Sequence, residues 1–367
     1  MKILLTGATG TLGSQILFCL LEEKFACLEM LYLPVREKAS ASPKARILNI
    51  LNSEFAPAFI KNNLADILAK ITVVPAKDML NPEIFLTGVR ITYFIHSAGF
   101  VNLSVLPAAR AEIFKENFDF TKSIFKAYVN FIDKFIYIST AFSAGDVGGL
   151  LPNNYLTTRP VEYRNHYEAS KHAAECYLAE AGASLNIPVQ ILRPSVLGGN
   201  IMDASSFFIS KYMVFYLFAK FFHRNNSADS VRITAHEESG LNIIPTDYAA
   251  KVVVTVFDSE IEQLNIVHSK TTPITKGITK IFDTVAFNNF KFTDKVVSTT
   301  TGFDSKLEKF YYDTIGLHLT PYLTSKPCEW DTTLLQEILP IPVYNLEEYL
   351  GDTIKFAQAH GFKSQSW

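Results

Sequence analysis

A tyrosine and a lysine four residues apart give the chain its sharpest catalytic signal. Tyr167 and Lys171 belong to the string YEASK, in a stretch that is predicted to be helical. Positions i and i+4 share a helix face, so we expect the Lys171 ammonium near the Tyr167 phenol. An unperturbed phenol has a pKa of about 10, and a nearby cation lowers that pKa. The pair predicts a proton donor or acceptor that works near neutral pH. The alternative is a chance pairing on a solvated helix face.

Two hydroxyl side chains lie upstream, at the end of a predicted strand. Ser139 and Thr140 follow the predicted strand at 134–138 and precede Tyr167 by less than thirty residues. A hydroxyl there can donate to a substrate oxygen while Tyr167 transfers the proton. The alternative is that these hydroxyls only cap the local backbone.

A glycine-rich turn at the start of the chain predicts a site for a dinucleotide. Gly7, Gly10 and Gly13 follow an apolar strand at 3–5 and precede a helix at 14–22. In such turns the first glycine permits the tight turn, the second lets the backbone approach a pyrophosphate, and the third allows close helix–strand packing. The helix N-terminus then offers free N–H groups and a positive dipole end to the phosphates.

The end of the second predicted strand indicates which dinucleotide is bound. Residues 30–35 are apolar and are followed by Arg36, with Lys38 two residues further on. An enzyme for NAD usually has Asp or Glu here to accept from the ribose 2′-hydroxyl, whereas an arginine accommodates a 2′-phosphate. We therefore favour NADP(H) over NAD(H). A solvated surface arginine is the alternative.

Strands and helices alternate along the first 200 residues. We predict strands at 3–5, 30–35, 71–75, 91–95, 134–138, 189–192 and 264–268, and helices at 14–22, 112–129 and 164–182. A further helix opens within 241–248, with Thr246 or Asp247 as N-cap. This alternation predicts an α/β fold with a doubly wound (Rossmann) parallel sheet, whose ligands bind beyond the carboxyl ends of the strands.

The pattern loosens after residue 199, which suggests two portions. We assign 1–199 and 241–269 to the dinucleotide-binding core, and 200–240 and 270–367 to a smaller, mostly C-terminal substrate-binding portion. Within the latter, residues 207–224 are dense in aromatic side chains, but their longest apolar run, 212–219, is far shorter than the roughly 20 residues of a membrane span. A buried helix or interface, a wall of the substrate site and a surface that touches lipid all remain open.

Composition excludes several classes of protein. Of 367 residues, 48% are hydrophobic and 19% charged, which suits a large globular core rather than a disordered chain. The net charge of −2 gives no general attraction to nucleic acid. The four cysteines show no spacing typical of a metal site and fit buried thiols in a reducing compartment. Met1 directly precedes the first strand, so we expect no signal peptide and a cytoplasmic protein.

Several motifs in order resemble the extended short-chain dehydrogenase/reductase superfamily. They are TGATGTLG at 6–13, HSAG at 96–99, ST at 139–140, YEASK at 167–171 and RPSVLGG at 193–199. The strings HSAGFVN at 96–102, YISTA at 137–141 and NIIPTDY at 242–248 resemble the thioester reductase and fatty acyl-CoA reductase branch. Sugar-nucleotide epimerases are a more distant match.

The resemblance implies a role for each matching residue. Gly7, Gly10 and Gly13 would hold the pyrophosphate together with Thr9, Thr11 and Leu12, and Arg36 would meet the adenosine 2′-phosphate. Asp78 and Met79 would flank the adenine, and Ala98 and Gly99 would line the nicotinamide side. Pro194, Ser195 and Val196 would contact the nicotinamide end of the cofactor. Thr140, with Ser139 as its substitute, would join Tyr167 and Lys171 in catalysis, and Lys171 would also bind the ribose hydroxyls.

Two departures from the family pattern concern the grip on the cofactor. Asn117 is not followed three residues later by the usual glycine, because Phe120 stands there, and no second arginine lies close to Arg36 in sequence.

We expect His96, at a strand end, to be a structural donor. His166, beside Tyr167, points elsewhere on the helix.

Three hypotheses for function follow. The first is an NADPH-dependent reductase of an acyl thioester, carried by coenzyme A or by an acyl carrier protein, to aldehyde or alcohol. The second is a sugar-nucleotide epimerase or dehydratase, or a hydroxysteroid-type dehydrogenase, of the same superfamily. The third is a non-enzymatic dinucleotide sensor. The acyl chain length, the number of reductions and the oligomeric state stay open.

Overall fold

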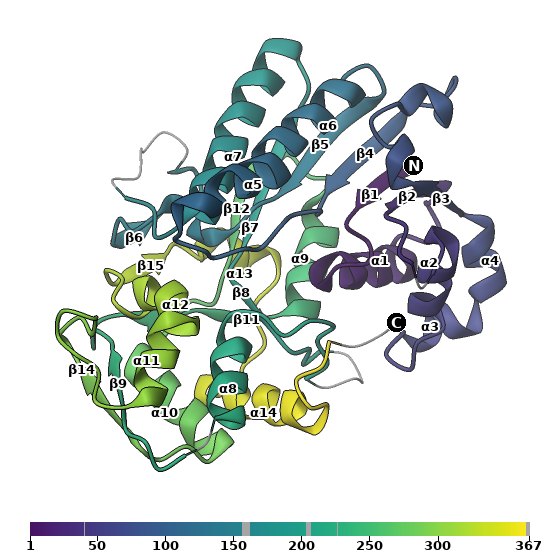
Figure 1. The fold of residues 1–367 in the computed structure, drawn as a ribbon. Coiled ribbons are helices and arrows are strands. Elements are labelled where there is room, and N and C mark those ends of the chain that lie inside the picture. Colours follow the sequence, from purple (N-terminus) through teal and green to yellow (C-terminus); the bar gives the residue numbers. More distant parts are fainter. Residues whose placement is uncertain (40, 156–161, 203–206, 226, 365–367) are drawn as a thin grey trace.

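A seven-stranded parallel sheet forms the centre of the molecule (Figure 1). The computed structural model describes residues 1–39, 41–155, 162–202, 207–225 and 227–364. The strand order is β12-β7-β5-β4-β1-β2-β3, all pairs parallel. The strands are β1 (Lys2–Thr6), β2 (Met30–Val35), β3 (Ile71–Pro75), β4 (Ile91–His96), β5 (Ile132–Ile138), β7 (Val189–Pro194) and β12 (Gln263–Ile266). This confirms the predicted α/β fold and the seven predicted strands.

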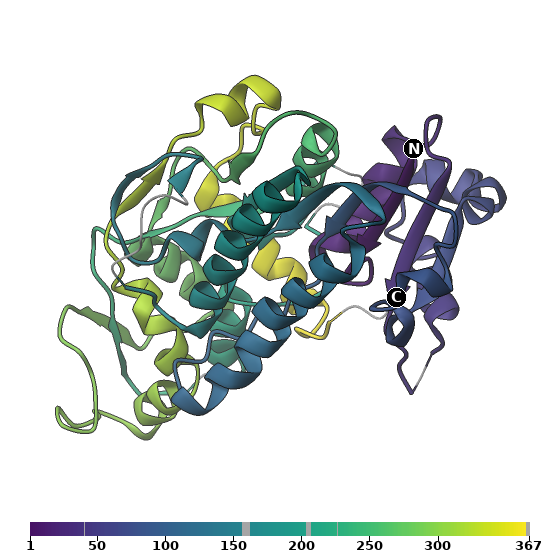
Figure 2. The same cartoon turned by 90° about the horizontal axis from the view of Figure 1, so that it is seen from above.

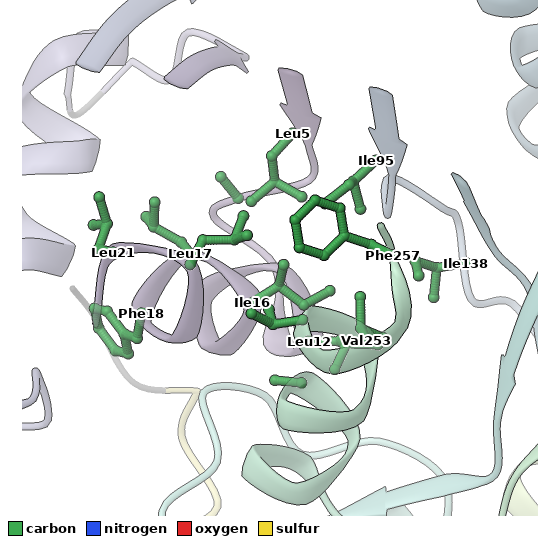
Figure 3. Close-up of a cluster of buried hydrophobic side chains, with 14 of the residues drawn as sticks. Leu5, Leu12, Ile16, Leu17, Phe18, Leu21, Ile95, Ile138, Val253 and Phe257 are labelled. Atoms are coloured by element: carbon green, nitrogen blue, oxygen red, sulfur yellow. The ribbon is translucent and has the colours of Figure 1, made fainter. Parts of the chain in front are cut away.

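Helices cover both faces of the sheet. One face packs on α1 (Thr11–Glu23), α2 (Pro43–Leu51), α3 (Ala58–Asn62), α4 (Leu64–Ala69) and α9 (Thr246–Val256). The other packs on α6 (Phe120–Tyr128) and α7 (His166–Leu185), with α5 (Arg110–Phe114) and the π-helical segment Lys115–Asp119 leading into α6. Figure 3 shows Leu12, Ile16 and Leu17 of α1, with Val253 of α9, packed against Leu5, Ile95 and Ile138 of the sheet.

A second buried core lies beside the sheet. It is built from α8 (Phe215–Arg224), α10 (Ile274–Val285), α11 (Lys306–Asp313), α12 (Ile315–Leu323) and α14 (Leu346–Ala359), with the parallel pair β9 (Val231–Thr234) and β14 (Phe290–Thr293). Figures 1 and 2 both show these helices on the side away from α2–α4. Residues 156–161 of the expected core, and 203–206, 226 and 365–367 of the expected substrate-binding portion, lie outside the described residues. The exact division into two portions stays a prediction.

Short strand pairs connect the two cores. They are β8 (Val196–Gly198) with β11 (Ile243–Pro245), β10 (Gly240–Leu241) with β13 (Thr272–Pro273), and β6 (Gly149–Leu151) with β15 (Cys328–Trp330), which precedes α13 (Thr333–Ile338). Each brings together segments that are distant in sequence. The pair β6–β15 holds the loop after β5 against the C-terminal third of the chain.

Three local expectations need correction. The aromatic stretch 207–224 is helical only from Phe215 onward, and residues 207–214 form no regular element. Helix α9 has Pro245 as N-cap and no side-chain capping bond. Asp247 instead accepts from the backbone N–H of Met202 at 2.6 Å. Cys27 is exposed and the other three cysteines are half-buried, so none is fully buried. Among the described residues, no helix is long and apolar enough to cross a membrane.

Candidate active site

The glycine turn between β1 and α1 has the geometry that its residues predict. Gly7 has φ +76°, and a Cβ there would lie 2.8 Å from the backbone nitrogen of Ala98. A Cβ on Gly13 would lie 2.0 Å from the carbonyl oxygen of Gly7, so only glycine allows α1 to approach the turn this closely. Gly10 is the N-cap of α1 and leaves the first N–H groups of the helix free of side-chain caps.

A cavity of about 440 Å³ opens beyond the carboxyl ends of the strands. It lies where the strand order changes direction between β1 and β4, the usual ligand crevice of such sheets. The cavity brings together these predicted residues: Gly10, Thr11, Leu12, Gly13, Arg36, Gly99, Ser139, Thr140, Tyr167, Lys171, Pro194, Ser195 and Val196.

Five predicted cofactor residues are not among those that line this cavity: Gly7, Thr9, Asp78, Met79 and Ala98. Gly7 and Ala98 touch each other beneath the turn. Thr9 accepts a hydrogen bond from Arg46 at 2.8 Å. The Met79 side chain is buried in the core, and its carbonyl oxygen accepts from the Tyr128 hydroxyl at 2.8 Å. Their roles toward a cofactor stay predictions.

The two strand-end hydroxyls have different partners. Ser139 Oγ donates to the buried Glu175 carboxylate, so its proton is already used. Thr140 Oγ1 accepts from the Phe142 backbone N–H at 3.3 Å, and among the described residues no acceptor takes its own proton. Both roles proposed for Thr140, local capping and donation into the cavity, are therefore compatible. Thr140 is therefore the better candidate for a hydrogen-bond donor to the substrate, because the proton of Ser139 is already donated to Glu175.

A buried ionic network stands behind Ser139. Glu175 on α7 pairs with Arg193 on β7 at 2.9 Å, and both side chains are fully buried. Ser143, in the turn after β5, donates to the same carboxylate at 2.6 Å. Arg193 also donates to Gln263 of β12 at 2.8 Å. The network joins α7 to three neighbouring segments of the sheet and so fixes the position of the Ser139–Thr140 turn.

Lys171 is almost fully buried beneath the cavity. Its ammonium donates to the Ile138 carbonyl oxygen at 2.7 Å and lies 4.1 Å from the centre of the Tyr137 ring. Burial lowers the pKa of Lys171 to about 7, against the attraction of Glu175, which raises it. The lysine therefore carries only part of a positive charge at neutral pH.

The expected lowering of the Tyr167 pKa does not occur in the free protein. Burial raises the pKa of Tyr167 above its ordinary value, and repulsion from Glu168 adds to the shift. Desolvation raises the pKa because the charged phenolate loses its favourable hydration when the side chain is buried. Tyr167 is thus a protonated phenol facing the cavity, suited to donating a proton rather than removing one.

His96 and Asn117 support the loop after β4. His96 contacts the hydroxyls of Thr6 at 2.8 Å and Thr121 at 3.0 Å, and burial together with Lys171 lowers its pKa to about 3. This neutral, fully buried ring is structural, as expected. Asn117 lies in the π-helical segment, a feature often found at functional sites. It binds both backbone groups of Phe100, at 2.8 and 3.0 Å, and so holds that loop without the family glycine.

One wall of the cavity is apolar and comes from the second core. It is formed by α8, α10 and α12 with the segment before α8, through Ile209, Phe215, Phe218, Ile274, Ile278, Ile281, Leu319 and Leu323. Part of the aromatic stretch 207–224 therefore faces the same space as Thr140 and Tyr167. Phe222, on the same helix, is buried in the core and does not line the cavity, whereas His223 and Arg224 at the end of the helix are exposed.

Four cations cluster at the other end of the cavity. Arg46 on α2 donates to the carbonyl oxygen of Arg36 at 2.6 Å, and burial with repulsion from Arg36 lowers its pKa. Lys211 lines the cavity together with Arg36, and Lys38 lies close enough to repel it. None of the four forms an ion pair within the described part of the chain. An anion is the natural partner of such a group.

Sequence reasoning missed two members of this cluster. Arg46 supplies the second arginine that seemed absent near Arg36, and its place in the first helix after β2 is a signal that could have revealed it. Lys211 comes from a distant segment, and no local pattern indicates its position.

Comparisons with known proteins are consistent with this geometry. A sequence model of the family described as "Male sterility protein" (NAD_binding_4) matches residues 5–253. The terminal R domain from the myxalamid PKS-NRPS pathway is similar in structure, with TM-score 0.68 and 18% identity over 100% of this chain and 92% of that one. So is a thiolation-reductase di-domain from an archaeal non-ribosomal peptide synthetase, with TM-score 0.68 and 18% identity over 99% and 91%.

A third similar structure is that of an epimerase and not of a reductase domain. The UDP-glucuronic acid 4-epimerase from Bacillus cereus, in complex with NAD, has TM-score 0.64 and 16% identity over 100% of both chains. At these identities the structural likeness shows the fold. No curated protein sequence matches the chain.

Proposed function

The chain belongs to the male sterility protein family of the extended short-chain dehydrogenase/reductase superfamily, and from this membership we propose that it is an NADPH-dependent reductase of acyl thioesters. The membership makes it an enzyme of a class that works with nicotinamide dinucleotides. The substrate and the choice of NADPH are the proposal.

The observation that carries the proposal is the shared cavity. Its lining joins the hydroxyl of Thr140 and the phenol of Tyr167 to the apolar wall from α8, α10 and α12. Ligand sites are usually apolar pockets with a few convergent polar groups, and an acyl chain with one reactive carbonyl matches that division. The R-domain structures, which are similar over nearly the whole chain, support the same branch.

The residues present fit a bound dinucleotide. Gly7 and Gly13 let the turn pack closely where a Cβ would meet the backbone. The first N–H groups of α1 have no side-chain cap, and Lys171 stands near Gly99, in the loop after β4. When bound, the cofactor supplies a hydride to the acyl carbonyl carbon.

The chain's own groups act on the carbonyl oxygen. We propose that Thr140 and Tyr167 donate hydrogen bonds to this oxygen, where negative charge develops, because donors fixed in place stabilise such charge most effectively. The raised pKa of Tyr167 keeps its proton in place until it is needed. The carbonyl re-forms as the thiolate leaves and takes up a proton, so that the net products are an aldehyde and a thiol. The buried Glu175 keeps the Thr140 turn in position through Ser139 and Ser143.

The basic cluster supports NADP(H). A 2′-phosphate carries close to two negative charges near neutral pH, and Arg36, Arg46 and Lys38 offer cations that have no carboxylate partner in the described part of the chain, at the end of β2. An NAD-specific site would instead place a carboxylate near this strand end.

A sugar-nucleotide epimerase or dehydratase is the second candidate. It is favoured by the likeness to the NAD-bound epimerase over 100% of both chains. The apolar wall argues against a sugar, because sugar hydroxyls buried there would lack hydrogen-bond partners.

The test mixes purified protein with NADPH and acyl-CoA thioesters of increasing chain length, and follows the loss of NADPH absorbance. We expect turnover with medium or long apolar chains, and aldehyde or alcohol as product. Tyr167→Phe should lower kcat by about 10²- to 10⁴-fold without weakening NADPH binding. Tyr177→Phe, on the same helix but packed against Phe118 and Phe125, is the matched control.

Two results would reject the proposal. One is a folded protein that binds NADPH but turns over no thioester, whether coenzyme A-linked or carrier-linked. The other is co-purification of tightly held NAD together with conversion of a UDP-sugar, which would establish the second candidate.

A further inference from the structure

A strap of chain, residues 207–214, connects the dinucleotide end of the cavity to its apolar wall. Ser210 Oγ donates to Thr11 Oγ1 at the start of α1, at 3.3 Å. Phe208 stacks on Phe55, between α2 and α3, with ring centroids 3.9 Å apart. The strap thus lies against the glycine-turn helix and the α2–α3 loop, although it leads directly into α8 of the second core.

Lys211, in the middle of the strap, faces the basic cluster. It lines the same cavity as Arg36. The surrounding chain desolvates its ammonium group although the residue remains exposed, and this desolvation, together with repulsion from Lys38, Arg36 and Arg46, lowers its pKa. Like charges held this close cost free energy, and the cost is removed only when an anion sits among them.

The residues that follow Lys211 belong to the acyl end of the cavity. Met213, Val214 and Phe215 line it, and Phe215 begins α8. Val214 has φ +52°, in the left-handed region that a β-branched residue enters only with strain. Such strained residues are concentrated at ligand clamps and switch regions. Lys211 and the apolar wall are therefore separated by only one short, strained connection.

We propose that Lys211 is a ligand of the 2′-phosphate of NADP(H), supplied by the second core, and that this contact couples cofactor binding to the shape of the acyl site. The inference rests on the proposed function, in which the cofactor is NADP(H). The phosphate would draw the strap onto Arg36 and Arg46 and so fix the positions of Met213, Val214 and Phe215. By reciprocity, an acyl group bound against Phe215 would tighten the phosphate contact to the same degree.

The experiment uses 2′,5′-ADP, which carries the 2′-phosphate but no nicotinamide, so no turnover disturbs the measurement. Calorimetry gives its dissociation constant, and that of NAD⁺, for the wild type, Lys211→Met, Lys211→Arg and the control Lys220→Met. Lys220 lies on α8, outside the cavity lining, and donates to the Phe362 carbonyl oxygen at 3.3 Å. The same titrations with S-decanoyl-pantetheine, with and without 2′,5′-ADP, measure the coupling.

We expect Lys211→Met to bind 2′,5′-ADP about tenfold more weakly, the effect of losing one charge-assisted hydrogen bond, with NAD⁺ binding unchanged. Lys211→Arg should recover most of the affinity, and Lys220→Met should behave as the wild type. In the wild type, 2′,5′-ADP should tighten thioester binding about fivefold or more, and Lys211→Met should abolish that gain.

The outcomes that overturn the inference are distinct from those that overturn the proposed function. If the wild type prefers NADP⁺ to NAD⁺ but Lys211→Met binds 2′,5′-ADP normally, Lys211 is not a phosphate ligand and only the inference fails. A wild type in which 2′,5′-ADP leaves thioester affinity unchanged would refute the coupling. If the wild type shows no preference for the 2′-phosphate, both the inference and the proposed cofactor are wrong.

Discussion

The hydroxyls of Thr140 and Ser139 are adjacent in sequence, but their surroundings give them different roles. Ser139 is held by Glu175, whereas the proton of Thr140 remains available to the cavity. The sequence placed both at the strand end and preferred Thr140 only through family resemblance. The physical reason lies in Glu175, which reaches Ser139 from another element and therefore leaves no trace in the local pattern.

Substituting these two residues should separate catalysis from stability. Thr140→Ala should lower kcat by roughly 100- to 1000-fold, as the loss of one oxyanion donor typically does, with little change in the free energy of unfolding. Ser139→Ala should retain more activity but cost about 1–3 kcal/mol of stability, because the Glu175 carboxylate loses a buried donor. Steady-state kinetics and urea unfolding measure the two effects. Equal effects of both substitutions on kcat would contradict this division.

Lys171 should make stability depend on pH. Its pKa falls from an ordinary 10.5 to about 7 on folding, so between these values the unfolded chain binds a proton that the folded chain lacks. Stability therefore rises with pH across this window, by at most about 1.4 kcal/mol per pH unit. We expect the free energy of unfolding of the wild type, minus that of Lys171→Met, to increase from about pH 7 to about pH 10. A difference that stays flat or falls would show that Lys171 remains charged when buried.

At the scale of elements, the buried pair Glu175–Arg193 joins α7 to β7, and its hydrogen bonds extend to the turn after β5 and to β12. Glu175→Leu should cost about 3–5 kcal/mol, because it leaves the Arg193 charge buried without a partner. The double variant Glu175→Leu, Arg193→Met should recover part of that loss. Urea unfolding measures both. If the double variant is less stable than Glu175→Leu, the loss of stability comes mainly from losing the ion pair, and not from leaving the Arg193 charge without a partner.

Strands and helices could be predicted where a run of neighbouring residues carries the pattern. Buried parallel strands appear as short apolar runs, and all seven strands of the sheet were identified in this way. The start of α8 was not, because residues 207–214 are as aromatic as the helix that follows, and hydrophobicity alone does not tell a buried strap from a buried helix. The π-helical segment around Asn117 was also missed, since one extra residue in a helical turn leaves the apolar pattern almost unchanged.

At the scale of the whole molecule, the basic cluster and the apolar wall were the least predictable features. Arg36 was identified from its strand end, and the place of Arg46 in the first helix after β2 is a local signal, but Lys211 joins them only through the fold. The wall likewise combines α8, α10 and α12, whose residues are up to about a hundred positions apart. A single sequence contains these residues without showing that they meet.

The wall should set the preferred acyl chain length. Phe218 lines the cavity, whereas Phe222, one turn further along α8, is buried in the core outside the lining. Phe218→Ala should shift the preference, measured as relative kcat/KM, toward longer acyl chains. Both substitutions should cost about 3–5 kcal/mol of stability, but Phe222→Ala should leave the chain-length preference unchanged. An identical change in preference in both variants would mean that loss of packing, and not cavity size, governs selectivity.

The position of the last strand of the sheet in the sequence affects how the protein folds during synthesis. β12 completes the edge beside β7 and supplies Gln263 to the buried Arg193, yet it follows residues 200–240 in the chain. A nascent polypeptide emerging from the ribosome therefore carries the glycine turn and every proposed catalytic side chain before its sheet is closed. The family match also ends at residue 253, ahead of this strand. A fragment cut at that boundary would expose β7 as an unpaired edge, which is the arrangement that invites one chain to pair with another.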